Sequence, residues 1–309
     1  MKAIGVTEFG GPDALTVHDL PERHPGAKEV RIRVSAAAVS PTDTNVRTGA
    51  YDMSQSEPPY LPGMDAAGVI DEVGPGSAWT VGDEVMAIAL PLGEHGGAYA
   101  EYLVASDDSI ARIPSSSTLE EAATIPMNGL TAVQILDFAA LEPGQVIAVT
   151  GAAGTLGNYT VQLAKQQGLT VIADAAPKDR ALVESLGADH IFDRGEGLAG
   201  RIREVFPDGV DAVADTALLH DDVVPALRDG GVFISVRGWK GEPTRDIRFE
   251  AAWVFDEYHS QAKLDSLRQA VEDGVLTPRV ADVLPAEEAP EAHRRLEAGG
   301  VRGRLVLAF

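Results

Sequence analysis

Hydrophobic and polar positions follow two different rhythms along this chain. From residue 1 to about residue 120, short apolar stretches alternate with glycine and proline turns, as in AIGVTEF, VRIRVSAAAVS, AAGVIDEVGPG, GDEVMAIAL and AYAEYLVAS. Stretches of this length, bounded by such turns, are typical of β-strands that form a sandwich or barrel. The pattern predicts a β-rich domain of barrel type, with the proline-containing residues 51–63 as an irregular surface loop.

A second rhythm begins near residue 120. The segment SSSTLEEAATIP has a polar start followed by two glutamates, which is a signal for the first turn of a helix. From residue 144, apolar runs alternate with segments of helical spacing. The expected strands are QVIAVT, TVIADA, HIFD, DAVADT and VFISVRG, and the expected helices are LGNYTVQLAKQQG, DRALVESLG, GLAGRIREVF and HDDVVPALRDGG. This alternation predicts βαβ units and hence a doubly wound parallel sheet.

The C-terminal part has a helical pattern around residues 260–273 and then a short apolar segment, RGRLVLAF, with the pattern of a strand. Because a single strand needs a sheet to join, we expect it to return to the N-terminal β domain. The predicted organisation of this α/β chain is residues 1–120, residues 121–258, and a segment over residues 259–309 that completes the first domain.

Charge narrows the possible partners. Acidic residues outnumber basic residues 47 to 25, which gives a formal net charge of −22. Such a charge repels nucleic acids and anionic membranes, so neither is an expected partner, and an anionic cofactor would need a local basic patch. The sequence has no long apolar run and no apolar signal core at its start. We therefore expect a soluble cytoplasmic protein without a membrane span.

The residue types present also limit the chemistry. The chain contains no cysteine, which excludes disulfides, thiol catalysis, iron–sulfur clusters and cysteine-ligated zinc. The seven histidines are scattered, and no two have the helical spacing that places two ligands on one face. The sequence therefore predicts no metal site.

The segment VTGAAGTLGN combines a strand end, three glycines and a helix start, at Gly151, Gly154 and Gly157. In a dinucleotide-binding fold, glycines let the main chain approach the pyrophosphate, which lies at the helix N-terminus. The usual fingerprint, G-x-G-x-x-G, is matched here with Ala152 in place of the first glycine and with Thr155 and Leu156 between the last two. Because βα units surround it, we interpret the loop as a dinucleotide site.

The choice between NAD and NADP depends on the end of the second strand of this domain. An acid there would bind the ribose 2′-hydroxyl of NAD, and Asp174 is a candidate. Lys178 and Arg180 follow directly, and these bases can instead bind the 2′-phosphate of NADP. The residues favour NADP and leave NAD as the alternative.

Further along, Asp215 and Thr216 close a parallel strand, and Val236 and Arg237 close another. Because open α/β sheets bind ligands at the carboxyl ends of their strands, these residues are also expected near the cofactor.

Many phrases of this chain resemble one known family. They are MKAIGVTEFGGPDALTV, AAAVSPTDTNVRTGAY, LPGMDAAGVIDEVG, GDEVMA, GGAYAEYLV, AATIPMNGLTAVQIL, VTGAAGTLG, SLGADHIFD and EAHRRLEAGGVRGRLVL. In this order they resemble the zinc-independent quinone oxidoreductases of the medium-chain dehydrogenase/reductase superfamily. The resemblance implies a GroES-like β-barrel catalytic domain, a Rossmann domain, a nicotinamide cofactor held between them and a homodimer.

The resemblance also bears on metal and cofactor. Zinc-dependent relatives have cysteine near Ser40 and His-Glu where this chain has Met64-Asp65. The position that aligns with the NAD-binding acid is Ala175 and not Asp174, and successive strand residues point to opposite faces. The resemblance therefore implies a metal-free enzyme that uses NADPH, with Lys178 and Arg180 as phosphate partners.

By family position, Asn128 and Thr131 border the nicotinamide, and Val236 and Arg237 contact its carboxamide. Members often carry tyrosine where this chain has Asn45, whereas Tyr51 matches a tyrosine near the substrate in several members. The predicted reaction is hydride transfer from NADPH to a quinone or an activated enone. Tyr51, Asn45 or a backbone amide would stabilise the developing oxyanion, and Asp43 would orient its own loop.

The alternatives to this function are another dehydrogenase class, another acceptor and a protein without turnover. Short-chain dehydrogenases need Tyr-x-x-x-Lys, and no tyrosine here has a lysine four residues on. An enoyl or alkenal reductase on the same fold stays open because it differs only in the acceptor. A non-catalytic protein that senses NADPH also stays open. Turnover with quinones, turnover with enones, and binding without turnover would distinguish the three.

Overall fold

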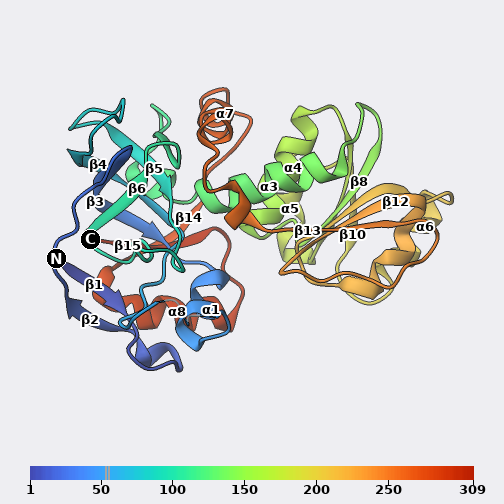
Figure 1. Ribbon diagram of the computed structural model, residues 1–309. Coiled ribbons are helices and arrows are strands. Elements are labelled where there is room, and N and C mark those ends of the chain that lie inside the picture. The colour runs from blue at the N-terminus through green and yellow to red at the C-terminus, as the bar shows by residue number, and fades with distance from the viewer. Residues whose placement is uncertain (53, 55) are drawn as a thin grey trace. The chain divides into compact units, whose positions relative to one another are not determined.

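The chain divides into two units, shown in a computed structural model that describes residues 1–52, 54 and 56–309 (Figure 1). Unit 1 comprises Met1–Met127, Tyr258–Gly274 and Pro278–Phe309, and unit 2 comprises Asn128–Glu257 and Val275–Thr277. In the sequence, unit 2 is thus inserted between the parts of unit 1. Among the helices described, none is at once long enough and apolar enough to span a bilayer.

Unit 1 is built on a largely antiparallel sheet. Its strands follow the order β14-β15-β3-β4-β5-β7, and β6 pairs with β3. Their bounds are β3 Glu29–Ala38, β4 Asp65–Val73, β5 Glu84–Ile88, β6 Tyr102–Ser106, β7 Ile110–Arg112, β14 Val280–Pro285 and β15 Arg304–Ala308. A separate pair is formed by β1 (Lys2–Gly5) and β2 (Thr16–Asp19).

The strand pattern read from the sequence explains the packing of β3. Val30, Ile32 and Val34 are buried in the core, whereas Arg31 and Arg33 between them face the other way. The last strand, β15, pairs antiparallel with β3, and Figure 1 shows the two side by side, one red and one blue. The C-terminal segment therefore belongs to the same sheet as the N-terminal strands.

The helices of unit 1 lie around this sheet. They are α1 Pro41–Thr48, α2 Leu119–Ala122, α7 Gln261–Glu272 and α8 Ala289–Ala298, with 3-10 turns at Pro12–Ala14 and Ala286–Glu288. At the start of α2, Thr118 Oγ1 accepts a hydrogen bond from the Glu121 amide, and the Glu121 carboxylate accepts one from the Thr118 amide. This capping box is the helix start that the sequence predicted.

Unit 2 contains a six-stranded sheet in which every neighbouring pair is parallel, in the order β10-β9-β8-β11-β12-β13. The strands are β8 Val146–Thr150, β9 Thr170–Ala175, β10 His190–Asp193, β11 Val210–Asp215, β12 Leu227–Val236 and β13 Arg248–Ala252. The helices are α3 Pro126–Ala139, α4 Thr155–Gln166, α5 Arg180–Ser185 and α6 Leu198–Val205, with 3-10 turns at Pro177–Asp179 and Val254–Glu257. This order is the 3-2-1-4-5-6 arrangement of a Rossmann fold, and it confirms the predicted parallel sheet.

One predicted helix is wrong. The sequence suggested a helix over residues 220–231, but the structure has two 3-10 turns, at His220–Asp222 and Val224–Ala226, and β12 begins at Leu227. Pro225 lacks an amide donor and so breaks the expected helical ladder. His220 has φ +51°, which is incompatible with a right-handed helix.

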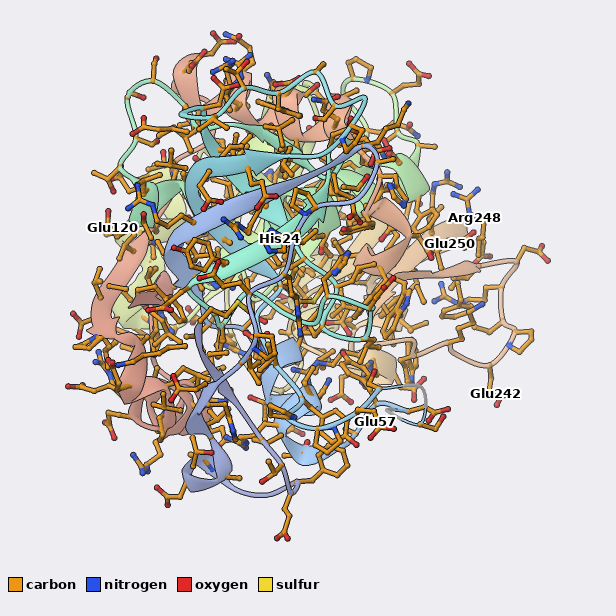
Figure 2. All side chains as sticks on the ribbon, turned by 60° about the vertical axis from the view of Figure 1, so that its left-hand side comes forward. His24, Glu57, Glu120, Glu242, Arg248 and Glu250 are labelled. Carbon is orange, nitrogen blue, oxygen red and sulfur yellow. The ribbon has the colours of Figure 1, made fainter. Side chains whose placement is uncertain are left out.

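Charged side chains protect one open edge of this sheet. β13 is one of the two edge strands, the other being β10, so among the residues described one side of its main chain has no neighbouring strand in the sheet. Arg248 and Glu250 both lie on β13, adjacent in Figure 2, and their side chains form an ion pair of 3.3 Å. Charges on an edge strand disfavour pairing with another sheet edge.

Candidate functional site

The glycine loop connects β8 to α4 in unit 2. Gly151 has φ +71°, a conformation that residues with a Cβ rarely adopt, and its carbonyl accepts a hydrogen bond from the Gly154 amide. Gly154 is the N-cap of α4 and has no side chain to cap the helix. The first amides of α4 have no acceptor within their own helix. Together with the helix dipole, they form a site that suits a phosphate group.

Gly157 lets α4 pack directly on this loop. A Cβ built on Gly157 would lie 2.4 Å from the Gly151 carbonyl oxygen and 2.8 Å from Ala152 Cα. Only glycine permits this approach, which is the third role of glycine in the fingerprint. Ala152 itself is fully buried, and Thr155 and Leu156 are half-buried at the helix start.

Asp174 faces the glycine loop. Its Oδ1 accepts hydrogen bonds from the amides of Gly151, at 2.6 Å, and Ala152, at 3.4 Å. The carboxylate is almost fully buried, and this burial raises its pKa above the ordinary value despite the two amides. Asp174 therefore anchors the loop, while Ala175 is the last residue of β9.

Three basic residues lie near the end of β9. Lys178 is exposed in the 3-10 turn that follows the strand. Arg180 begins α5, and its guanidinium lies 3.4 Å from the Glu184 carboxylate and donates to the Ile191 carbonyl. Arg194 is not among the site residues that the sequence predicts, and its amide donates a hydrogen bond to the Ala175 carbonyl at 3.0 Å.

The side chain of Arg194 also belongs to this region. Its Nε lies 3.7 Å from Asp174 Oδ2, and about half of the side chain is exposed. The position of Arg194 in the sequence could have indicated its role. It directly follows β10, the third strand of this sheet along the chain, and β10 neighbours β9 in the parallel order.

The ends of β8 and β11 meet where the strand order reverses. Thr150 Oγ1 donates to Asp215 Oδ1 at 2.7 Å, and Thr216 Oγ1 donates to the Thr150 carbonyl at 2.5 Å. This is the switch point at which open α/β sheets bind their ligands. The structure thus brings Thr216 against the glycine loop, 3.0 Å from where a Cβ on Gly151 would lie.

The loops that follow β11 and β12 hold their main chain in an unfavourable conformation. Leu218, His220 and Arg237 have φ of +61°, +51° and +62°, although none is glycine. Such strain costs free energy and is concentrated at functional sites. Val236 ends β12 and Arg237 is exposed beside it, at the same sheet edge as Thr216.

The remaining predicted residues fall in both units. Asn128 and Thr131 lie one turn apart on α3 in unit 2 and are both buried. Asn45 and Tyr51 lie in unit 1, where Asn45 Nδ2 donates to the Tyr51 hydroxyl at 3.2 Å. All predicted cofactor residues therefore belong to unit 2, and both predicted substrate residues belong to unit 1.

Comparison with known proteins identifies two matching families. Residues 26–115 match the alcohol dehydrogenase GroES-like domain, and residues 186–307 match the zinc-binding dehydrogenase family. Quinone oxidoreductase from Mus musculus is 31% identical over 99% of this chain and 97% of its own length. The chain belongs to the quinone oxidoreductase-like family of the medium-chain dehydrogenase/reductase superfamily. The predicted family and the predicted GroES-like and Rossmann fold class are confirmed.

Other members of the superfamily differ in acceptor and cofactor. A 2-haloacrylate reductase from a Burkholderia species is 29% identical over 99% of this chain and 99% of its own. A mycobacterial protein complexed with NADPH has 30% identity and a TM-score of 0.89, with 100% of both chains covered. A structure described as an NAD-dependent alcohol dehydrogenase has 32% identity and a TM-score of 0.87, also with 100% of both chains covered. The chain is an oxidoreductase of this superfamily.

The residues at the zinc positions of this superfamily do not fit zinc in this chain. Ser40, Met64 and Asp65 supply neither a thiolate nor an imidazole, the ligands that catalytic zinc prefers. Both carboxylate oxygens of Asp65 are engaged, one by the Met127 amide at 2.6 Å and one by Arg304 at 2.8 Å. Across residues 1–52, 54 and 56–309, no group of three or more histidine, aspartate or glutamate residues is arranged to hold a metal ion.

A buried polar cluster orders the start of α1 beside Asn45. The carboxylate of Asp43 accepts hydrogen bonds from the Ser40 amide, the Ser40 hydroxyl, the Gly63 amide and the Tyr99 hydroxyl. Burial raises the pKa of Asp43 to about 6, although the hydrogen bonds from Ser40 and Gly63 act in the opposite direction. The sequence predicts that Asp43 orients its loop but does not predict α1, whose signal is the capping box formed by Ser40 and Asp43.

Proposed function

We propose that this protein is an NADPH-dependent reductase that transfers hydride to a quinone or an activated enone without a metal ion. The cofactor assignment rests on the contacts that the Asp174 carboxylate makes. Its carboxylate accepts hydrogen bonds from the glycine loop, and Arg194, the residue after β10, lies beside it. A basic residue at this place, next to Ala175, suits a 2′-phosphate better than a ribose hydroxyl.

The cofactor, when bound, supplies a hydride from C4 of its reduced nicotinamide. The chain's own residues bind and orient it. The first amides of α4 bind the pyrophosphate, and Lys178 and Arg194 bind the 2′-phosphate. Around the nicotinamide we assign Asn128, Thr131, Thr216, Val236 and Arg237, which lie on α3 or at the carboxyl ends of β11 and β12.

On the acceptor side, we assign Tyr51 and Asn45 to the carbonyl oxygen of the substrate. A hydroxyl that accepts a hydrogen bond becomes a stronger donor, because neighbouring hydrogen bonds polarise one another. The bond from Asn45 to the Tyr51 hydroxyl has this sense. Tyr51 would therefore stabilise the negative charge that develops on the oxygen during hydride transfer.

A second candidate function is reduction of activated alkenes that bear a carboxylate or aldehyde. It is favoured by the similarity to 2-haloacrylate reductase, whose named substrate is an activated alkene. The cofactor side would be the same in both functions. Only the group that receives the hydride would differ.

The test is an acceptor screen that follows the absorbance of the reduced nicotinamide, run with NADPH and with NADH after treatment with a zinc chelator. We expect turnover with quinones, a preference for NADPH, and no effect of the chelator. Turnover with alkenes that bear a carboxylate or aldehyde, and not with quinones or enones, would support the second candidate. Saturable NADPH binding without turnover would contradict both and indicate a sensor. Activity that is lost on chelation and restored by zinc would refute the metal-free mechanism.

A further inference from the structure

Helix α1 has two buried charged residues on one face and Asn45 on the other. Asp43 and Arg47 are one helical turn apart, so their side chains share a face. Both are buried, with 0% and 2% of their surface exposed. Asn45 lies two positions from each, which places it about 160–200° around the helix. The orientation of the buried face therefore sets the direction of Asn45.

A histidine from the C-terminal helix α8 connects the two buried charges. His293 Nδ1 lies 3.3 Å from Arg47 Nη1, and its Nε2 lies 3.3 Å from the Tyr99 hydroxyl. The Tyr99 hydroxyl in turn donates to Asp43 Oδ2 at 3.2 Å. These hydrogen bonds form a continuous bridge from one end of α1 to the other, in the order Arg47, His293, Tyr99 and Asp43.

The chemistry of the groups fixes the direction of every hydrogen bond in this bridge. A guanidinium can only donate, so Nδ1 of His293 must accept, and the ring proton is on Nε2. That proton is donated to the Tyr99 oxygen, and the Tyr99 hydroxyl proton is donated to Asp43. Burial and the neighbouring Arg47 lower the pKa of His293 to about 3, so the ring is neutral at physiological pH.

The rest of the cluster prevents α1 from turning about its axis. Arg47 Nε donates to the Gly10 carbonyl at 3.1 Å, and Nη2 pairs with Glu297 of α8 at 2.5 Å. A rotation of α1 would break these bonds and leave a buried cation without partners, which is costly. α8 thus holds α1 both through His293 and through Glu297.

We propose that His293 is a positioning residue for the acceptor, because the bridge it completes fixes the rotation of α1 and so the place where Asn45 meets Tyr51. This inference rests on the proposed function, in which Asn45 and Tyr51 bind the acceptor. None of the residues of the bridge belongs to unit 2, which holds the glycine loop. Loss of the bridge should therefore change acceptor binding and leave cofactor binding intact.

The test compares three variants with the wild type. His293→Leu removes both hydrogen bonds of the ring. His293→Gln keeps an acceptor and a donor on one planar group and should rescue the bridge. Leu296→Ala is the matched control, because Leu296 lies on the same helix and packs against the hydrophobic core of unit 1 without joining the bridge. The measurements are kcat and KM for the acceptor, the dissociation constant of NADPH, and thermal stability.

We expect His293→Leu to raise the KM for the acceptor on the order of tenfold, since small displacements of a positioning group have effects of this size or larger. NADPH binding should stay within twofold of wild type. His293→Gln should restore most of the KM, and Leu296→Ala should lose stability with an unchanged KM. Equal changes of KM in His293→Leu and Leu296→Ala, or a weakened NADPH affinity, would overturn the proposal.

A measurement without turnover separates this inference from the proposed function. The NMR signals of the Asn45 side-chain amide can be assigned by their loss in Asn45→Ala. They should shift in His293→Leu and not in Leu296→Ala. If His293→Leu does not fold, Tyr99→Phe removes one hydroxyl from the bridge and should shift the same signals. Unshifted signals in the folded variant would refute the positioning role. A wild type that turns over no acceptor would refute the proposed function alone.

Discussion

The amide of Gly151 donates a 2.6 Å hydrogen bond to the carboxylate of Asp174. Asp174, which the sequence predicts as a candidate ligand of the ribose, therefore stabilises the glycine loop. This bond connects the end of β9 to the start of the loop after β8, the neighbouring strand. Cofactor affinity and cofactor choice are thus assigned to different residues at the same strand end.

We expect Asp174→Ala to weaken NADPH and NADH binding by similar factors. The substitution removes a hydrogen bond to a charged acceptor, which is worth about 1.5–3 kcal/mol, and leaves the Gly151 amide without that partner. Asp174→Asn, which keeps an acceptor oxygen, should lose less. Titration calorimetry with both cofactors measures this. A selective gain of NADPH over NADH would instead make Asp174 a ribose ligand.

Arg194 should discriminate between the two cofactors. Arg194→Ala removes a charge-assisted contact with the 2′-phosphate, so the KM for NADPH should rise about tenfold and that for NADH should change little. Lys178→Ala should act in the same direction. Arg180→Ala is the matched control, because Arg180 pairs with Glu184 and the Ile191 carbonyl. An Arg180 variant that loses NADPH selectivity while the Arg194 variant keeps it would reverse this assignment.

Two helical glycines should respond in opposite ways to alanine. In Gly157→Ala the new Cβ would lie 2.4 Å from the Gly151 carbonyl oxygen, so α4 and the loop must move apart and NADPH binding should weaken. Among the residues described, and apart from its chain neighbours and its own helix backbone, Gly200 of α6 has no atom within 4 Å of such a Cβ. Gly200→Ala should therefore raise stability by about 0.5–1 kcal/mol with unchanged NADPH affinity. Denaturant unfolding and cofactor titration of the two variants measure this contrast.

Stability should depend on pH through His293. Its folded pKa of about 3 lies below the ordinary value of 6.5, so the unfolded chain binds more protons between these pH values. The contribution of His293 to stability therefore rises with pH over this window, by a few kcal/mol in total. Asp43, with a folded pKa of about 6 against 3.8, contributes the opposite slope between pH 3.8 and 6.

His293→Gln removes the first of these two slopes and keeps the second. Relative to wild type, the variant should gain stability as the pH falls from 6.5 towards 4, as measured by urea unfolding at a series of pH values. The same pH dependence in both proteins would mean that His293 is not buried as a neutral ring.

The buried ion pair of Asp65 and Arg304 should be expensive to break from one side. Arg304→Met leaves a fully buried carboxylate without its cation and should cost about 3–5 kcal/mol of unfolding free energy. A double variant, Asp65→Leu with Arg304→Met, removes both charges and should cost less than the single one. A double-mutant cycle by chemical unfolding gives the coupling. Additive losses would contradict a direct interaction between the two side chains.

Much of the fold could be predicted because its signals are periodic. The strand and helix rhythm after residue 144 follows from apolar runs that a parallel sheet buries on both faces. The glycine spacing at Gly151, Gly154 and Gly157 reflects close contact of main-chain atoms, which only small residues allow. Each of these constraints limits which residue types are allowed at one position. It can therefore be recognised in the sequence without knowing which distant residues are in contact.

Other features depend on contacts between distant residues. α1 is short, and two of its three buried residues, Asp43 and Arg47, are charged, so Val46 alone does not make an apolar pattern. Their burial is possible because Tyr99 and His293, far away in the sequence, supply the hydrogen bonds. The place of Arg194 likewise depends on the neighbouring strand. Local patterns cannot predict such arrangements.

The pairing of β15 with β3 has a consequence for how the protein folds during its synthesis on the ribosome. All of unit 2 has been synthesised before Arg304–Ala308, so its parallel sheet can form while the other unit still lacks a strand. Until that strand is added, the edge of β3 at Ala36–Ala38 stays unpaired and Asp65 has no cation. Because synthesis runs from the N-terminus to the C-terminus, unit 1 contains the residues that are made first and yet is the last to complete its sheet.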